Sequence, residues 1–312
     1  MNLKKLKPVH WIYNLIHYKA IRHNRDAYRK YELNKPLIAS VSSKDFPDKE
    51  SKAWLDLGNS RSLAPLKPAF AAFPVPVQEK ILSWSDNGYM IIEKLFSDET
   101  IDKINDEIDL LIRKKKLNFN SSHKLLFANR KSTFIKSITK DPLLHAVLEF
   151  ILDKEVVAFQ TINFFKGSEQ RAHSDSVHMT TYPLGYLIAA WIALEDTNSE
   201  NGPLFYYPGS HRLPYLLNND FNEGETALTL GKKNYDDYED RVETLLRQNP
   251  FEKKSFHAKK GDVLIWHANL VHGGSPIINP ALTRKSMVIH FYAKDVIKYH
   301  EITERPSLLQ DE

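Results

Sequence analysis

The chain has 312 residues, of which 42% are hydrophobic, 26% charged and 11% aromatic, so it is globular and too rich in aromatic residues to be disordered throughout. It contains no cysteine, which excludes disulfides, cysteine-ligated zinc, iron–sulfur clusters and a thiol nucleophile. Its net charge of +4 is too small to indicate a nucleic-acid partner, and none is expected.

Residues 1–77 are expected to form a basic extension. Residues 1–35 carry nine Lys and Arg residues against two acidic ones, and the apolar stretch 11–16 lies among these cations. Such a segment either packs on its own domain or lies on an anionic membrane surface. Its apolar run is too short for a signal peptide, so we expect a cytoplasmic protein, with peripheral membrane contact as the alternative. The prolines between 65 and 76 predict an extended connector.

The organised domain is expected to span residues 78–312 and to begin with a short apolar strand at 89–92. Ser97 fits an N-cap, and isoleucine and leucine then recur at helical spacing up to the cations at 113–116. Asp141 and Pro142 fit the cap and first residue of a second helix.

Beyond residue 155 the apolar residues alternate, as in strands. The predicted strands are 156–165, 186–194, 204–207, 262–267 and 286–292. Helices followed by many short strands predict an α+β fold with a mainly β core of the jelly-roll, cupin-like type. A polar insertion at 213–256 interrupts the strands; its 235–247 part is expected to be helical, and such insertions often act as lids.

His173 and Asp175 directly follow a predicted strand and turn, and residues two apart in an extended segment share a face. An imidazole and a carboxylate from one segment, with a distant histidine, make the facial triad of mononuclear non-haem Fe(II) enzymes. The candidates for the distant ligand are His178, His211, His257, His267, His272 and His290. His272 is favoured because a strand delivers it and two glycines, Gly273 and Gly274, allow a tight turn beside the metal.

Arg284 and Ser286 lie two apart at the start of the last predicted strand and share a face with His290. A buried guanidinium beside a hydroxyl suits the far carboxylate of a dicarboxylate cosubstrate. Asn163 and Gln170, on or after the strand that leads to His173, are further candidates for binding the cosubstrate.

Other polar side chains near these positions are candidates for contacting the substrate. They are His178, Thr180, Tyr182, His211, His267 and His290. Each has an equally simple structural explanation, as a hydrogen-bonded residue of a loop, a turn or the end of a strand.

The order of these motifs resembles the phytanoyl-CoA dioxygenase family over roughly residues 78–292. The resemblance rests on the segments 170–175, 191–196, 202–212, 261–273 and 284–286. It implies a double-stranded β-helix flanked by N-terminal helices, with Fe(II), 2-oxoglutarate as cosubstrate and O2. Matched position by position, His173, Asp175 and His272 correspond to the iron ligands. Arg284 and Ser286 correspond to the residues that bind the C5 carboxylate of 2-oxoglutarate.

The resemblance implies hydroxylation of an unactivated C–H bond in a small molecule or metabolite, with release of succinate and CO2. In halogenating relatives a small residue replaces the ligand carboxylate, so Asp175 favours hydroxylation. Two alternatives stay open. One is the same chemistry on a lipid-linked substrate at a membrane surface, and the other is a non-catalytic, cupin-like binding protein.

Overall fold

The computed structural model of the protein describes residues 5–221, 225–231 and 235–308. The first four residues of the expected extension and parts of the expected insertion therefore lie outside the described residues.

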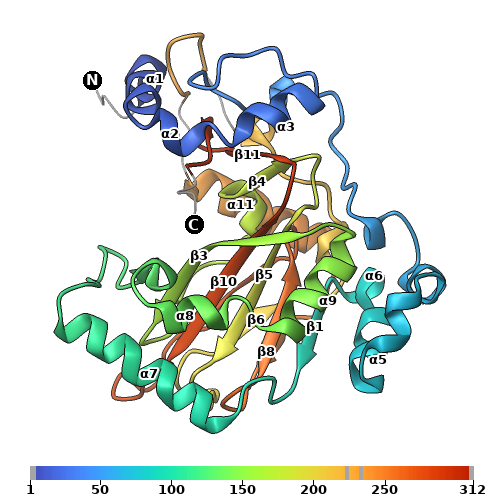
Figure 1. The fold of residues 1–312 in the computed structure, drawn as a ribbon, viewed down its shortest axis with the longest axis vertical. Helices are drawn as coiled ribbons and strands as arrows, with labels where there is room; N and C mark the ends of the chain where they lie inside the picture. Colours follow the sequence, from blue (N-terminus) through green and yellow to red (C-terminus); the bar gives the residue numbers. More distant parts are fainter. Residues whose placement is uncertain (1–4, 222–224, 232–234, 309–312) are drawn as a thin grey trace.

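A six-stranded antiparallel sheet forms the centre of the molecule, with the strand order β1-β8-β5-β10-β3-β2 (Figure 1). Its strands are β1 (Tyr89–Ile92), β2 (Leu125–Leu126), β3 (Val156–Phe164), β5 (Leu187–Ala193), β8 (Val263–His267) and β10 (Ser286–Ala293). All except the two-residue β2 lie where the sequence predicted a strand.

Two three-stranded sheets complete the β structure, with the orders β7-β6-β9 and β12-β11-β4. Their strands are β4 (Thr180–Tyr182), β6 (Leu204–Tyr206), β7 (Lys254–Phe256), β9 (His272–Gly274), β11 (Ile297–His300) and β12 (Arg305–Pro306). Tyr206 and Phe256 of one small sheet pack with Trp191 and Trp266 of the large sheet in a single buried cluster. The facing sheets form the predicted double-stranded β-helix in an α+β fold.

Helices cover the opposite face of the large sheet (Figure 1). They are α7 (Asp98–Arg113), α8 (Thr133–Ile138) and α9 (Pro142–Leu152), and α5 (Val75–Leu82) and α6 (Trp84–Asn87) lie beside the edge strand β1. Ser97 and Asp141 cap α7 and α9 as predicted, because their side chains accept hydrogen bonds from the backbone N–H groups of Thr100 and Leu144.

Alternation along β10 divides its side chains between two environments. Met287, Ile289 and Phe291 belong to the core under the helices. Val288 and His290 face a cavity between the sheets. The large sheet is thus supported by a helical layer on one side and offers its other side to a binding site.

The expected extension is folded against the domain. It contains α1 (Lys7–Ile16), α2 (Tyr18–Ile21), α3 (Asn24–Lys30) and α4 (Ser60–Leu63). The proline-rich stretch is not an extended connector, since it forms 3₁₀ turns at Ala64–Leu66 and Pro68–Ala72 and the start of α5. Its prolines occupy first-turn positions, where a missing N–H breaks no helical hydrogen bond.

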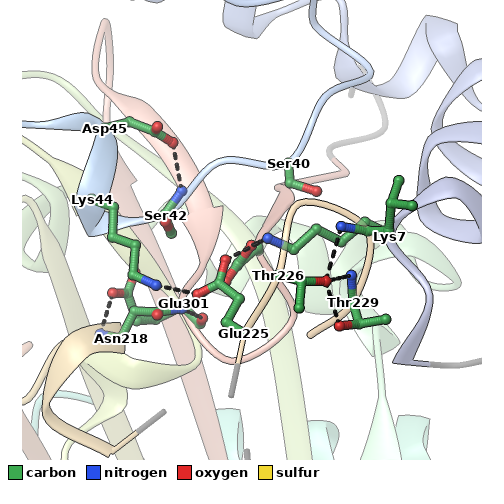
Figure 2. A network of polar contacts seen from close by, with 12 residues as sticks. Lys7, Ser40, Ser42, Lys44, Asp45, Asn218, Glu225, Thr226, Thr229 and Glu301 are labelled. Carbon is green, nitrogen blue, oxygen red and sulfur yellow. Dashed lines mark hydrogen bonds and ion pairs between the residues drawn. The ribbon is translucent and has the colours of Figure 1, made fainter. Parts of the chain in front are cut away.

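A polar network ties this extension to the insertion and to the C-terminal segment (Figure 2). Lys7 forms ion pairs with Glu225 and, at 2.7 Å, with Glu304. Asn218 donates from its amide to Glu304 at 2.8 Å, and the backbone N–H of Ser43 donates to Glu301 at 3.2 Å. Three segments far apart in sequence are therefore joined at one end of the molecule.

The insertion contains α10 (Asn218–Phe221) and α11 (Tyr235–Gln248), the second of which confirms the helix predicted there. Among the helices of the described residues, none combines the length and the hydropathy needed to cross a bilayer.

Candidate active site

His173, Asp175 and His272 converge between the sheets, where one ligand atom from each lies within 4.8 Å of the others. An antiparallel bridge joins the two histidines. The backbone N–H of each donates to the carbonyl of the other, both at 2.9 Å. These two hydrogen bonds fix the spacing of the histidines. All three side chains are buried, so solvent hardly reaches this metal-binding group.

Both histidines present the same ring nitrogen to this centre. The Nδ1 atom of His173 lies 2.8 Å from the carbonyl of Arg171, and Nδ1 of His272 lies 2.9 Å from that of Leu270. A carbonyl only accepts, so each Nδ1 carries the proton and each Nε2 keeps a lone pair for a metal. Burial, aided by His272, lowers the pKa of His173 to about 3, which keeps its imidazole in the neutral form that binds metal.

The two carboxylate oxygens of Asp175 have different surroundings. Oδ2 accepts a hydrogen bond from the indole Nε1 of Trp266 at 2.8 Å and lies 3.5 Å from Nε2 of His290. Oδ1 lies 3.8 Å from Nε2 of His272. Burial acts to raise the pKa of Asp175, but His272 and then His290 lower it below its ordinary value, so the carboxylate is ionised.

This donor set fits a mononuclear iron ion. Two imidazole nitrogens and one carboxylate oxygen are the protein ligands of the facial triad, which leaves other coordination positions for a cosubstrate. The indole of Trp266 donates a hydrogen bond to the carboxylate of Asp175. Residues that hydrogen-bond to metal ligands in this way orient them.

Arg284 lies in the same region with only 2% of its surface exposed. Its Nη1 donates to Oγ of Ser286 at 2.8 Å, whereas its buried Nε has no hydrogen-bond partner. Burial lowers the pKa of Arg284 to about 10, against the opposing effect of Glu195, so the guanidinium is still charged at neutral pH. A buried cation with an unused donor is suited to an anionic ligand.

A cavity of about 470 Å³ connects Arg284 with the triad. Lys124, in the loop before β2, also lines it and donates to Oε1 of Gln170 at 3.3 Å. The cations of Lys124 and Arg284 each lie 5.4 Å from the ring centre of Phe164. Both therefore flank the same end of the cavity, where a doubly charged cosubstrate would fit.

The structure brings seven of the predicted site residues to this cavity. They are Gln170, His173, Asp175, His178, His272, Arg284 and His290. The remaining predicted residues do not line it, and they are Asn163, Thr180, Tyr182, His211, His267 and Ser286. Ser286 nevertheless holds Arg284 through its hydroxyl.

Asn163 is not placed to bind the cosubstrate. Its neighbours Ile162 and Phe164 line the cavity, so alternation along β3 turns its amide toward the opposite face. Thr180 donates to the carbonyl of Ser176 at 2.6 Å, and the ring of Tyr182 stacks on Phe46 at 4.0 Å.

His267 faces away from the cavity, because its neighbour Trp266 faces into it and side chains alternate along β8. Its Nε2 lies 2.8 Å from the Asp56 carboxylate, which comes from the extension. The ring of His211 lies 5.3 Å from that of His267 and belongs to this second cluster. No pattern in the sequence pairs Asp56 with a strand so distant.

The two glycines after His272 serve close packing and not a turn, because both lie in β9 without a positive φ. A Cβ at Gly273 would lie 2.6 Å from the carbonyl of Gln170, and one at Gly274 would lie 2.7 Å from the N–H of Glu169. Only glycine lets β9 pass this close to the segment that leads to His173.

Helix α11 of the insertion packs over the ligand segment. The Tyr238 hydroxyl accepts from the backbone N–H of Ser174 at 2.9 Å. The Tyr235 hydroxyl accepts from Gln170 at 3.2 Å, and its ring lies 4.8 Å from that of His178. Solvent is thus excluded from this side of the triad by the insertion.

The profile of the phytanoyl-CoA dioxygenase (PhyH) family matches residues 84–286. Among curated proteins, an ectoine dioxygenase of Bordetella bronchiseptica is 26% identical over 219 residues, which cover 65% of this chain and 71% of that protein.

Solved structures show the same fold. The α-ketoglutarate-dependent carbocyclase SnoK from nogalamycin biosynthesis aligns with a TM-score of 0.59 and 16% identity, over 77% of this chain and 97% of that one. EctD from S. alaskensis, solved with 2-oxoglutarate and 5-hydroxyectoine, aligns with a TM-score of 0.54 and 21% identity, over 81% of this chain and 86% of that one.

The Trp266→Phe variant is expected to bind iron more weakly, because it removes the donor that holds Oδ2 of Asp175. Loss of such an outer partner costs about 10- to 100-fold in metal affinity. The measurement is an anaerobic Fe(II) titration of each variant. Trp84→Phe is the matched control, since the buried indole N–H of Trp84 has no hydrogen-bond partner. Equal iron affinity in the two variants would contradict the role given to Trp266.

Proposed function

The chain belongs to the phytanoyl-CoA dioxygenase (PhyH) family of Fe(II)- and 2-oxoglutarate-dependent oxygenases, and on that premise we propose that it hydroxylates an unactivated C–H bond of a small molecule, with release of succinate and CO2. The observation that carries the proposal is the complete, buried triad of His173, Asp175 and His272. Beside it lies the guanidinium of Arg284, whose Nε has no hydrogen-bond partner.

Asp175 favours hydroxylation over halogenation. Its carboxylate occupies the position that halogenating relatives leave to a small residue, and Trp266 holds it in place by a 2.8 Å hydrogen bond. The negatively charged Asp175 carboxylate therefore takes the place at the iron that a halide ion would need.

The residues of the chain bind and orient the reactants. His173, Asp175 and His272 hold the iron; Arg284, supported by Ser286, binds the far carboxylate of 2-oxoglutarate, and Lys124 lies beside it. When bound, the iron would let O2 act as the oxidant and 2-oxoglutarate as the reductant, and this chemistry would break the C–H bond. Water is kept out by the rings of Phe164 and Trp191, over which the Arg284 guanidinium lies, and by α11.

The size of the cavity supports a small-molecule substrate. Its volume of about 470 Å³ lies within the range of ordinary ligand pockets, about 300–1,000 Å³. The apolar residues that line it include Phe127, Phe159 and Met179, which suit the carbon skeleton of a metabolite.

Succinate formation tests the proposed reaction. The Fe(II)-loaded protein with 2-oxoglutarate and O2 is expected to release succinate and to add one oxygen atom to a substrate found by screening metabolites by mass spectrometry. His272→Ala should abolish succinate formation, because it removes an iron ligand, whereas His257→Ala, at an exposed position, should not. Undiminished turnover in His272→Ala, or a chlorinated product of the wild type, would contradict the proposal.

Arg284→Ala is expected to raise the KM for 2-oxoglutarate strongly while Fe(II) affinity changes little. Losing a buried charge-assisted contact costs about 2–5 kcal/mol, which corresponds to about 30-fold to several thousand-fold. Arg284→Lys should recover part of the loss, because an ammonium lacks the planar two-bond contact. Ser286→Ala should be milder, at about 1.5–3 kcal/mol. The measurement is a 2-oxoglutarate titration of succinate formation, and an unchanged KM in Arg284→Ala would remove this residue from the site.

A second candidate is the same chemistry on a lipid-linked substrate at a membrane surface, and the composition of α1 favours it. The buried residues of α1 are polar: Lys7, His10 and Asn14. Its exposed residues include Ile12 at 60%, Leu15 at 59% and Ile16 at 73% accessibility. Exposed cations follow in Lys19 and Arg25. An exposed apolar stripe beside cations suits an anionic bilayer.

Flotation with vesicles that contain phosphatidylserine tests this candidate. The wild type is expected to float at low salt and to be partly released at high salt, because salt screens the cations. Ile16→Asp should weaken flotation, whereas Ile278→Asp, at an equally exposed position (69%) in another part of the surface, should not. A wild-type protein that stays with the soluble fraction at low salt would exclude the second candidate.

A further inference from the structure

The cavity holds more positive charge than iron and 2-oxoglutarate require. Four cationic side chains line it, Lys124, Arg130, Arg284 and Arg305, and Asp175 is the single carboxylate among the described lining residues. Fe(II) and the doubly negative 2-oxoglutarate cancel each other in charge. The loaded cavity therefore keeps a positive excess, which an anionic ligand would neutralise.

Two of the cations lie close together, and Arg130 lies apart from them. Lys124 and Arg284 flank Phe164 at the end of β3. Arg130 donates to the carbonyl of Phe159, which lies five residues before Phe164 in β3. Five residues of a strand span about 17 Å, so Phe159 and Phe164 are about 17 Å apart along the backbone. A five-carbon diacid held by Arg284 does not span that distance, so the positive charge of Arg130 acts on a different part of the cavity.

Arg305 is the fourth of these cations. Its strand β12 pairs with β11, so that Arg305 lies opposite His300, and the ring of His300 lies 5.5 Å from that of His178, three residues after Asp175. The Arg305 guanidinium lies over the ring of Tyr13 at 4.3 Å. Its Nε and Nη2 atoms are buried and have no hydrogen-bond partner.

A guanidinium whose face lies on an aromatic ring keeps its edge for hydrogen bonds. The edge that carries Nε and one Nη matches two oxygens of a carboxylate or a phosphate group. Leaving these donors buried and unpaired costs free energy that such a group would recover. A cationic substrate would find no unengaged carboxylate among the described residues of the cavity.

We propose that the substrate to be oxidised carries a carboxylate or phosphate group, and that Arg305 binds this group in the cavity with Arg130 adding positive charge. Phe127, Phe159 and Met179 contact the carbon skeleton of the substrate, which leaves a C–H bond of its middle part near the triad. This inference rests on the proposed function, because it assigns the anion to a second molecule beside 2-oxoglutarate.

Equilibrium binding tests the inference without turnover. The full chain is loaded with Fe(II) and saturating 2-oxoglutarate under anaerobic conditions. It is then titrated by calorimetry with four probes of equal chain length: hexanoate, hexyl phosphate, 1-hexanol and hexylamine. We expect at least one of the two anions to bind about tenfold or more tightly than the alcohol and the amine, as one or two hydrogen bonds to a charged group imply. The comparison of hexanoate with hexyl phosphate identifies which anion the site prefers.

Variants locate the effect. Arg305→Gln should abolish the preference for anions and leave 2-oxoglutarate affinity unchanged, and Arg305→Lys should keep part of the preference. Arg113→Gln, at an exposed position at the end of α7, is the matched control and should behave as wild type, and thermal unfolding verifies that each variant is folded. Equal binding of hexanoate, hexyl phosphate and 1-hexanol, or a preference that survives in Arg305→Gln, would overturn the inference. Failure of 2-oxoglutarate itself to bind would instead contradict the proposed function, so the two failures are distinct.

Discussion

Two backbone hydrogen bonds between His173 and His272 are the constraint on which the site depends. They join segments that are distant in the sequence and set the ligand nitrogens at a fixed spacing before any metal binds. Each imidazole is further oriented by a backbone carbonyl, and Asp175 is held by an indole from β8. Because these partners are backbone carbonyls of the folded chain and a buried indole of β8, the arrangement costs little reorganisation on binding.

Patterns that depend on period and spacing predicted much of this structure. Alternation located the strands of the large sheet, and the spacing of His173 and Asp175 predicted that they share a site. Two-residue spacing also placed Arg284 beside Ser286, whose hydroxyl accepts from its guanidinium. These predictions succeeded because they depend on local backbone geometry, which an extended segment fixes over two or three residues.

Other predictions failed where the answer depended on partners from distant segments. Alternation says that Asn163 and Phe164 face opposite sides, but it does not say which side holds the site. His267 was a candidate ligand because nothing in its neighbourhood reveals Asp56. The glycines after His272 were expected to make a turn, whereas they allow one chain segment to pass close to another. Lys124 lies in a polar loop with no periodic signal, and only the folded chain brings it beside Gln170.

The contacts of α1 with the C-terminal segment have a consequence for how the molecule is made. Lys7 forms an ion pair with Glu304, and the ring of Tyr13 lies against the Arg305 guanidinium. The first helix therefore makes these contacts only once the last residues of the chain are present. During synthesis domains fold progressively as the chain emerges, and contacts between such distant segments carry a large loop-closure entropy. The rim of the cavity around Arg305 therefore depends on residues from both ends of the chain. A chain that stops before residue 304 would keep the three iron ligands and lack this rim.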